Sequence, residues 1–146
     1  MLIYIMGKTA AFVCARACGR WGEGAGMTVS GIGGVFIRAR DPEALTAWYR
    51  EHLGVGSGEY GLWEPAAGPS VFAAFAQDSD YFAADRQFML NFRVSDLDAL
   101  IAALIAAGMA VITKPEWDTP GVGRFARIHD PEGNPVELWE PAPGHH

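Results

Sequence analysis

The chain has 146 residues, of which 50% are hydrophobic, and its formal net charge at pH 7 is -6. This composition excludes a generally disordered chain and predicts one globular domain or two small fused halves. The acidic charge and the lack of a basic cluster argue against a nucleic-acid partner, and no apolar run in the sequence is long enough to span a membrane. The two cysteines, Cys14 and Cys18, lie near the N-terminus, which favours a cytoplasmic protein that disulfides do not hold together.

Residues 1–26 differ from the rest of the sequence, because a short apolar stretch is followed there by a glycine-rich one. We expect a flexible N-terminal extension, with the domain proper covering residues 27–146. A signal peptide is the alternative, although Lys8 interrupts the apolar residues. Cys14 and Cys18 are compatible with a disulfide or with half of a zinc site.

The first regular elements are a strand and a helix. Apolar and polar residues alternate over residues 33–40, which predicts a β-strand. Asp41 is suited to cap the next helix, Pro42 to occupy its first position and Gly54 to end it.

A turn-rich segment follows this helix. Within it, residues 59–64 and 70–76 are candidate strands, separated by proline and glycine. Residues 77–87 are polar and aromatic, and we expect a loop that is anchored by Tyr81 and Phe82.

The second half repeats this order of elements. Residues 88–94 alternate like a strand, and Asp96 is suited to cap a helix that ends at Gly108. Residues 110–113 are predicted to form a short strand, and the loop after it carries Trp117.

Residues 124–141 consist of two alternating runs separated by the turn residues Asp130-Pro131-Glu132-Gly133-Asn134. Proline presets φ for a turn, and glycine or asparagine tolerates positive φ, so we expect a β-hairpin. If these five residues form the loop, the pairs that face each other are Phe125 with Trp139, Arg127 with Glu137, and His129 with Pro135. A bulge that shifts the pairing by one residue is the alternative.

The two strand–helix units share a repeated pattern. Arg38, Asp41, Ala44 and Leu45 recur as Arg93, Asp96, Ala99 and Leu100, with the same offset of 55 residues each time (38 to 93, 41 to 96). Neither half could easily bury its helix and its sheet face alone, so we expect the two halves to share a core.

Several segments of this repeat match a known superfamily. They are Val35-Phe36-Ile37-Arg38-Ala39-Arg40-Asp41-Pro42-Glu43, His52-Leu53-Gly54, Asn91-Phe92-Arg93-Val94-Ser95-Asp96-Leu97-Asp98-Ala99-Leu100 and Asp130-Pro131-Glu132-Gly133-Asn134-Pro135-Val136-Glu137-Leu138. A tandem βαβββ chain with these segments resembles the vicinal oxygen chelate superfamily, which includes glyoxalase I, bleomycin-resistance proteins and extradiol dioxygenases.

The resemblance implies an α+β fold. In it, tandem βαβββ modules, about residues 30–87 and 88–141, form a curved eight-stranded mixed sheet around a cup, with the helices on the outer face. It also implies a homodimer.

Metal-dependent members of the superfamily hold a divalent metal ion with four side chains in this cup. Carried onto this chain, three of the ligand positions are Gly34, Met89 and Glu137. The fourth falls within residues 70–77, which contain no acidic residue. Glu137 is therefore the only retained candidate, and a divalent ion needs at least three good protein donors. We expect no metal or other cofactor, and a divalent metal remains the less favoured alternative.

The favoured hypothesis is a metal-poor cup that binds a small aromatic or amphipathic molecule, as in sequestration or resistance. The alternatives are a metal-dependent lyase, isomerase or dioxygenase with a displaced metal site, and a scaffold for a partner chain. No catalytic residue is assigned. A purely structural role for Arg127 with Glu137, and for each tryptophan, stays open. The predicted ligand-binding residues are Phe36, Met89, Asn91, Phe125, Arg127, Glu137 and Trp139 in the cup, and Trp63 and Trp117 in loops.

Overall fold

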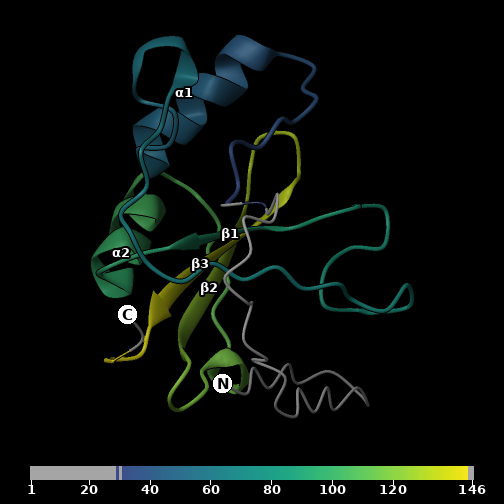
Figure 1. Ribbon diagram of the computed structural model, residues 1–146, viewed down its shortest axis with the longest axis vertical. Coiled ribbons are helices and arrows are strands. Elements are labelled where there is room, and N and C mark those ends of the chain that lie inside the picture. The colour runs from purple at the N-terminus through teal and green to yellow at the C-terminus, as the bar shows by residue number, and fades with distance from the viewer. Residues whose placement is uncertain (1–28, 30, 145–146) are drawn as a thin grey trace, which may run out of the picture.

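The computed structural model describes Val29 and residues 31–144, and its centre is a three-stranded mixed sheet (Figure 1). The strand order is β1-β3-β2, in which β1 runs parallel to β3 and β2 runs antiparallel to it. The elements in chain order are α1 (Pro42–Leu53), the 3-10 helix η1 (Glu59–Gly61), β1 (Leu90–Arg93), α2 (Leu97–Ala106), the 3-10 helix η2 (Pro115–Trp117), β2 (Gly123–His129) and β3 (Pro135–Pro141). The predicted extension, with both cysteines, lies outside the described residues.

Both α-helices begin at the predicted aspartate caps. The Asp41 carboxylate accepts a hydrogen bond of 3.0 Å from the Ala44 amide, and the Asp96 carboxylate accepts one of 2.9 Å from the Ala99 amide. Gly54 ends α1 with a φ of 66°, which a residue with a side chain adopts at a cost. Neither helix in the described part of the chain has the length and apolar content needed to cross a membrane.

The hairpin of β2 and β3 has the predicted register. Phe125 pairs with Trp139, Arg127 with Glu137 and His129 with Pro135. Gly133 has a φ of 78° in the five-residue turn, and its amide donates a hydrogen bond of 2.8 Å to the Asp130 carbonyl. Because the side chains along a strand alternate between faces, this register places Arg127 and Glu137 together on one face of the sheet.

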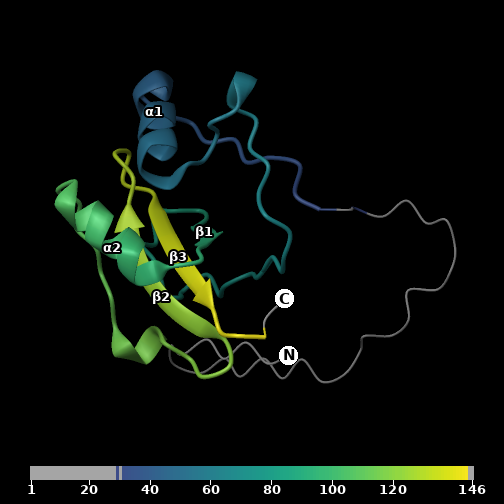
Figure 2. The same ribbon diagram turned by 90° about the vertical axis from the view of Figure 1, so that its left-hand side faces the viewer.

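The hydrophobic core lies on the other face of the sheet, where α1 and α2 cover it. Figure 2 shows α2 across this face and α1 near one end of it, whereas a large part of the segment between η1 and β1 runs along the opposite side. Burying each large aliphatic side chain here contributes about 1.5–3 kcal/mol. The buried members are Leu45 and Tyr49 from α1, Leu97 and Leu104 from α2, Ala126 and Ile128 from β2, and Val136 and Leu138 from β3.

The structure corrects the strand predictions for the first half. Residues 33–40 and 70–76 form no strand, and residues 59–64 contain a 3-10 helix in place of one. In the second half, residues 110–113 form only an isolated bridge, in which Ile112 and Arg127 exchange two backbone hydrogen bonds of 2.8 Å. An alternating segment without a pairing partner gains little from extension, since strands are stabilised by their neighbours. The eight-stranded tandem arrangement is therefore not confirmed among the described residues, although the α+β class is.

Candidate functional site

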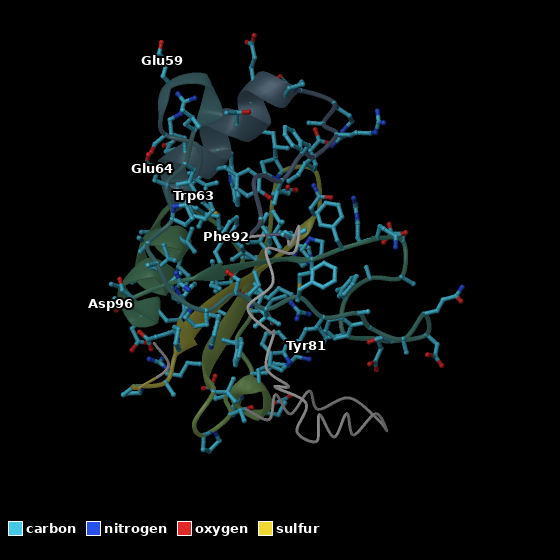
Figure 3. All side chains as sticks on the ribbon, viewed as in Figure 1. Glu59, Trp63, Glu64, Tyr81, Phe92 and Asp96 are labelled. Atoms are coloured by element: carbon cyan, nitrogen blue, oxygen red, sulfur yellow. The ribbon has the colours of Figure 1, made fainter. Side chains whose placement is uncertain are left out.

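The face of the sheet opposite the core carries polar and aromatic side chains, and part of the long segment before β1 lies over it. A hollow of ≈ 550 Å³ opens between that segment and the second half of the chain. One wall consists of residues 77–84, and Figure 3 labels Tyr81 within it. The other wall is formed by Ile112, Lys114, Trp117, Arg127, His129 and Pro135.

Glu137, from the middle of β3, is the buried anion at this face. Its Oε1 atom accepts a hydrogen bond of 2.6 Å from the Tyr81 hydroxyl and one of 3.3 Å from Arg127 Nη2. Its Oε2 atom accepts a hydrogen bond of 2.7 Å from Asn91 Nδ2. The Glu137 side chain is only 7% exposed, so these three donors replace the water that its charge would otherwise bind.

Burial raises the pKa of Tyr81, and the nearby charge of Glu137 raises it further. The phenol therefore stays protonated at neutral pH and serves as a hydrogen-bond donor to the carboxylate. This bond ties residues 77–84 to the sheet.

Arg127 occupies the space between two aromatic rings. The carbon at the centre of its guanidinium lies 4.5 Å from the Tyr81 ring centroid and 4.7 Å from the Trp117 ring centroid. Its Nη1 atom donates a hydrogen bond to the Tyr81 carbonyl. Its Nε–H is buried and has no acceptor among the described residues. Arg127 thus joins β2, the loop that carries Tyr81, and η2.

The residues around Glu137 do not fit a divalent metal ion. Both carboxylate oxygens already accept hydrogen bonds from neutral or cationic donors, and none of these donors is an anionic ligand. The described residues contain no group of three histidine, cysteine, aspartate or glutamate side chains that could hold a metal.

Four of the sequence-predicted residues meet in one network, namely Asn91, Trp117, Arg127 and Glu137. Phe125 and Trp139 stack nearly parallel beside it, with ring centroids 6.3 Å apart, and Trp139 Nε1 donates a hydrogen bond of 3.1 Å to the Val122 carbonyl. Met89 is half-buried immediately before β1.

Phe36 and Trp63 lie outside this network. Phe36 is 97% exposed, because residues 33–40 do not join the sheet. The Trp63 ring contacts the edge of Phe92, with centroids 5.7 Å apart (Figure 3). Phe92 pairs with Leu138 on the helix-covered face, so Trp63 is on the opposite side of the sheet from Glu137.

The comparison with known proteins identifies the family. A family model described as a glyoxalase-like domain matches residues 34–139. The chain belongs to the glyoxalase-like domain family. This confirms the predicted resemblance to the vicinal oxygen chelate superfamily.

Individual relatives of this glyoxalase-like chain share part of its length. A segment of 52 residues, 36% of the chain, is 48% identical to proteins named "Putative glyoxylase CFP32" in Mycobacterium bovis and Mycobacterium tuberculosis. That match spans 20% of those relatives' length.

Solved structures are also similar. The crystal structure of TnmS3, an antibiotic-binding protein from Streptomyces sp. CB03234, has a TM-score of 0.51 and 27% identity, and the match covers 80% of this chain and 100% of TnmS3. A glyoxalase/bleomycin resistance protein from the same Streptomyces is 28% identical over 71% of this chain and 95% of its own, with a TM-score of 0.43.

Tyr81 contacts Glu137 in the site of this glyoxalase-like domain but was not predicted as a ligand-binding residue. Its position in a polar loop predicted an anchor, but nothing in the local pattern indicated that the anchor point is Glu137, 56 positions further along the chain. Ile112, Lys114 and His129 line the hollow and were likewise not predicted as ligand-binding residues.

Proposed function

We propose that this glyoxalase-like chain binds a small aromatic or amphipathic molecule in the hollow beside Trp117 and does so without a metal ion, as in sequestration or resistance. The observation that carries the proposal is that both Glu137 oxygens already accept hydrogen bonds from Tyr81, Asn91 and Arg127, so a cation would have to displace these donors. The structural similarity to TnmS3, an antibiotic-binding protein, supports the binding of a small molecule.

The lining of the hollow suits such a ligand. Its volume of ≈ 550 Å³ is within the range of small-molecule pockets, which runs from about 300 to 1,000 Å³. The rings of Tyr81, Phe82 and Trp117 offer apolar surface, and Ser79, Lys114 and His129 offer polar atoms at the same walls. A planar ring system with one or two polar substituents matches this combination.

Replacing Trp117 with leucine is expected to weaken the binding of a planar aromatic probe such as 2-naphthol by about tenfold, because one stacking surface is lost. Isothermal titration calorimetry measures this change. Trp48→Phe is the matched control, since Trp48 packs against Tyr49 on α1 and does not line the hollow. Equal weakening in both variants would point to a general loss of structure and contradict a local binding role.

Metal analysis of the purified protein separates this proposal from the enzyme alternative. We expect no stoichiometric iron, manganese, nickel or zinc and no effect of a chelator on probe binding. One metal ion per chain that is lost in Glu137→Gln would overturn the metal-free proposal and favour a lyase, isomerase or dioxygenase with a displaced metal site.

We further propose that the chain forms a homodimer through apolar side chains of its first half. Phe36 is 97% exposed and Phe72 is 98% exposed, and Val35, Val71 and Leu62 are also exposed. Exposed apolar side chains commonly mark an interface when they gather into one patch.

Light scattering during size-exclusion chromatography is therefore expected to give twice the chain mass of 15.7 kDa. Phe72→Asp is expected to give the monomer mass. Ile105→Asp, at an exposed apolar position on α2, should remain dimeric. A monomeric wild type would contradict the dimer proposal.

A further inference from the structure

Cationic and anionic side chains lie on opposite walls of the hollow. Lys114 and Arg127 belong to the wall that η2 and β2 support, whereas Asp78 and Asp80 belong to the wall formed by residues 77–84. A ligand in the hollow therefore experiences cationic groups on one side and carboxylates on the other.

Lys114 is the cation of this wall that lacks an acidic partner. No carboxylate among the described residues lies within ion-pair distance of its ammonium, which is 5.2 Å from the Trp117 ring centroid. The charge of Arg127, in contrast, is balanced by Glu137 at 3.3 Å. Two cations at one tryptophan ring repel each other, so an anion next to Lys114 would lower the electrostatic energy of the wall.

Arg127 supplies a second indication of an acceptor on the ligand. Its side chain is only 9% exposed, and its Nε–H has no acceptor among the described residues. A buried donor without an acceptor is costly, and a small shift of the guanidinium toward an oxygen atom of a ligand in the hollow would remove that cost.

We propose that the ligand is an aromatic acid, with its ring beside Trp117 and its carboxylate beside Lys114 on the Arg127 wall. This inference rests on the proposed function and specifies the class of ligand. Asp78 and Asp80 disfavour the reverse orientation, because they would place like charges next to the ligand carboxylate.

The test compares two probes of nearly equal shape, 2-naphthoate and the neutral 2-naphthamide, by isothermal titration calorimetry with the full chain at pH 7.5 and low salt. We expect wild type to bind 2-naphthoate about fivefold more tightly than 2-naphthamide, the size of effect typical of one partly exposed ion pair. Lys114→Met should remove this preference without weakening 2-naphthamide, and added salt should reduce it. Arg38→Gln, which removes an exposed cation that does not line the hollow, should retain the preference.

The outcomes distinguish this inference from the proposed function. If wild type binds both probes equally, or if Lys114→Met keeps the preference for 2-naphthoate, the aromatic-acid inference is overturned while small-molecule binding stands. If wild type binds neither probe and no planar aromatic compound quenches its tryptophan fluorescence, the proposed function itself fails. Asp80→Asn should strengthen 2-naphthoate binding or leave it unchanged, and weaker binding would contradict the assigned orientation.

Discussion

Replacing Arg127 with methionine is expected to lower the free energy of unfolding by about 3–5 kcal/mol, because it leaves Glu137 as a buried charge without its cationic partner. The two remaining donors, Tyr81 and Asn91, are neutral and compensate only in part. The substitution also removes the guanidinium that lies between Tyr81 and Trp117. Urea unfolding monitored by circular dichroism measures the change.

The double variant Arg127→Met, Glu137→Met is the matched control. Replacing both members of a buried ion pair by apolar side chains is often close to neutral, so we expect the double variant to recover most of the lost stability. Recovery would also be visible if the single variant is too unstable to purify. A single variant within about 1 kcal/mol of wild type would show that the buried pair is not what holds this face together.

Replacing Asp130 with alanine is expected to cost about 3 kcal/mol or more, because its buried carboxylate organises the hairpin turn and links it to α1. It accepts hydrogen bonds of 2.9 Å from the Glu132 amide, 2.8 Å from the Asn134 amide and 2.8 Å from Asn134 Nδ2. A fourth bond of 2.9 Å comes from the Tyr49 hydroxyl. Thermal and urea unfolding of the variant measure the loss.

Tyr49→Phe serves as the graded comparison, since it removes only the bond between α1 and the turn. We expect a cost of about 1 kcal/mol, the usual net contribution of a single hydrogen bond. Burial, followed by the charge of Asp130, raises the pKa of Tyr49, so the hydroxyl donates this bond throughout the neutral range. Equal costs for Asp130→Ala and Tyr49→Phe would mean that the turn does not depend on the carboxylate.

Arg127 and Asp130 lie in the part of the chain where the local sequence predicts the observed structure. Turn residues, alternation and capping aspartates act over a few positions, and the hairpin and both helices appear where these signals are found. The first half shows the opposite case. Residues 33–40 and 70–76 have a strand-like pattern, but a strand forms only when a neighbour supplies its hydrogen bonds, and no neighbour does so among the described residues.

The candidate site likewise has one part that the local sequence predicted and another that depends on tertiary packing. The pairing of Arg127 with Glu137 follows from the hairpin register, so the sequence alone predicted that the carboxylate would have a partner. The donors from Tyr81 and Asn91 come from segments far from Glu137 in the chain, and only the packing of a loop and of β1 against β3 brings them there.

The sequence by itself indicated the family, and it determined where both helices begin, the turn and the register of the last two strands. These local features could be predicted because each depends on contacts between residues that are close along the chain. The tertiary structure decided which face of the sheet is open, which loop lies over it and which cation there lacks an acidic partner. These features depend on contacts between segments that are distant along the chain. Such contacts form only when the whole core is buried, so no local pattern in the sequence predicts them.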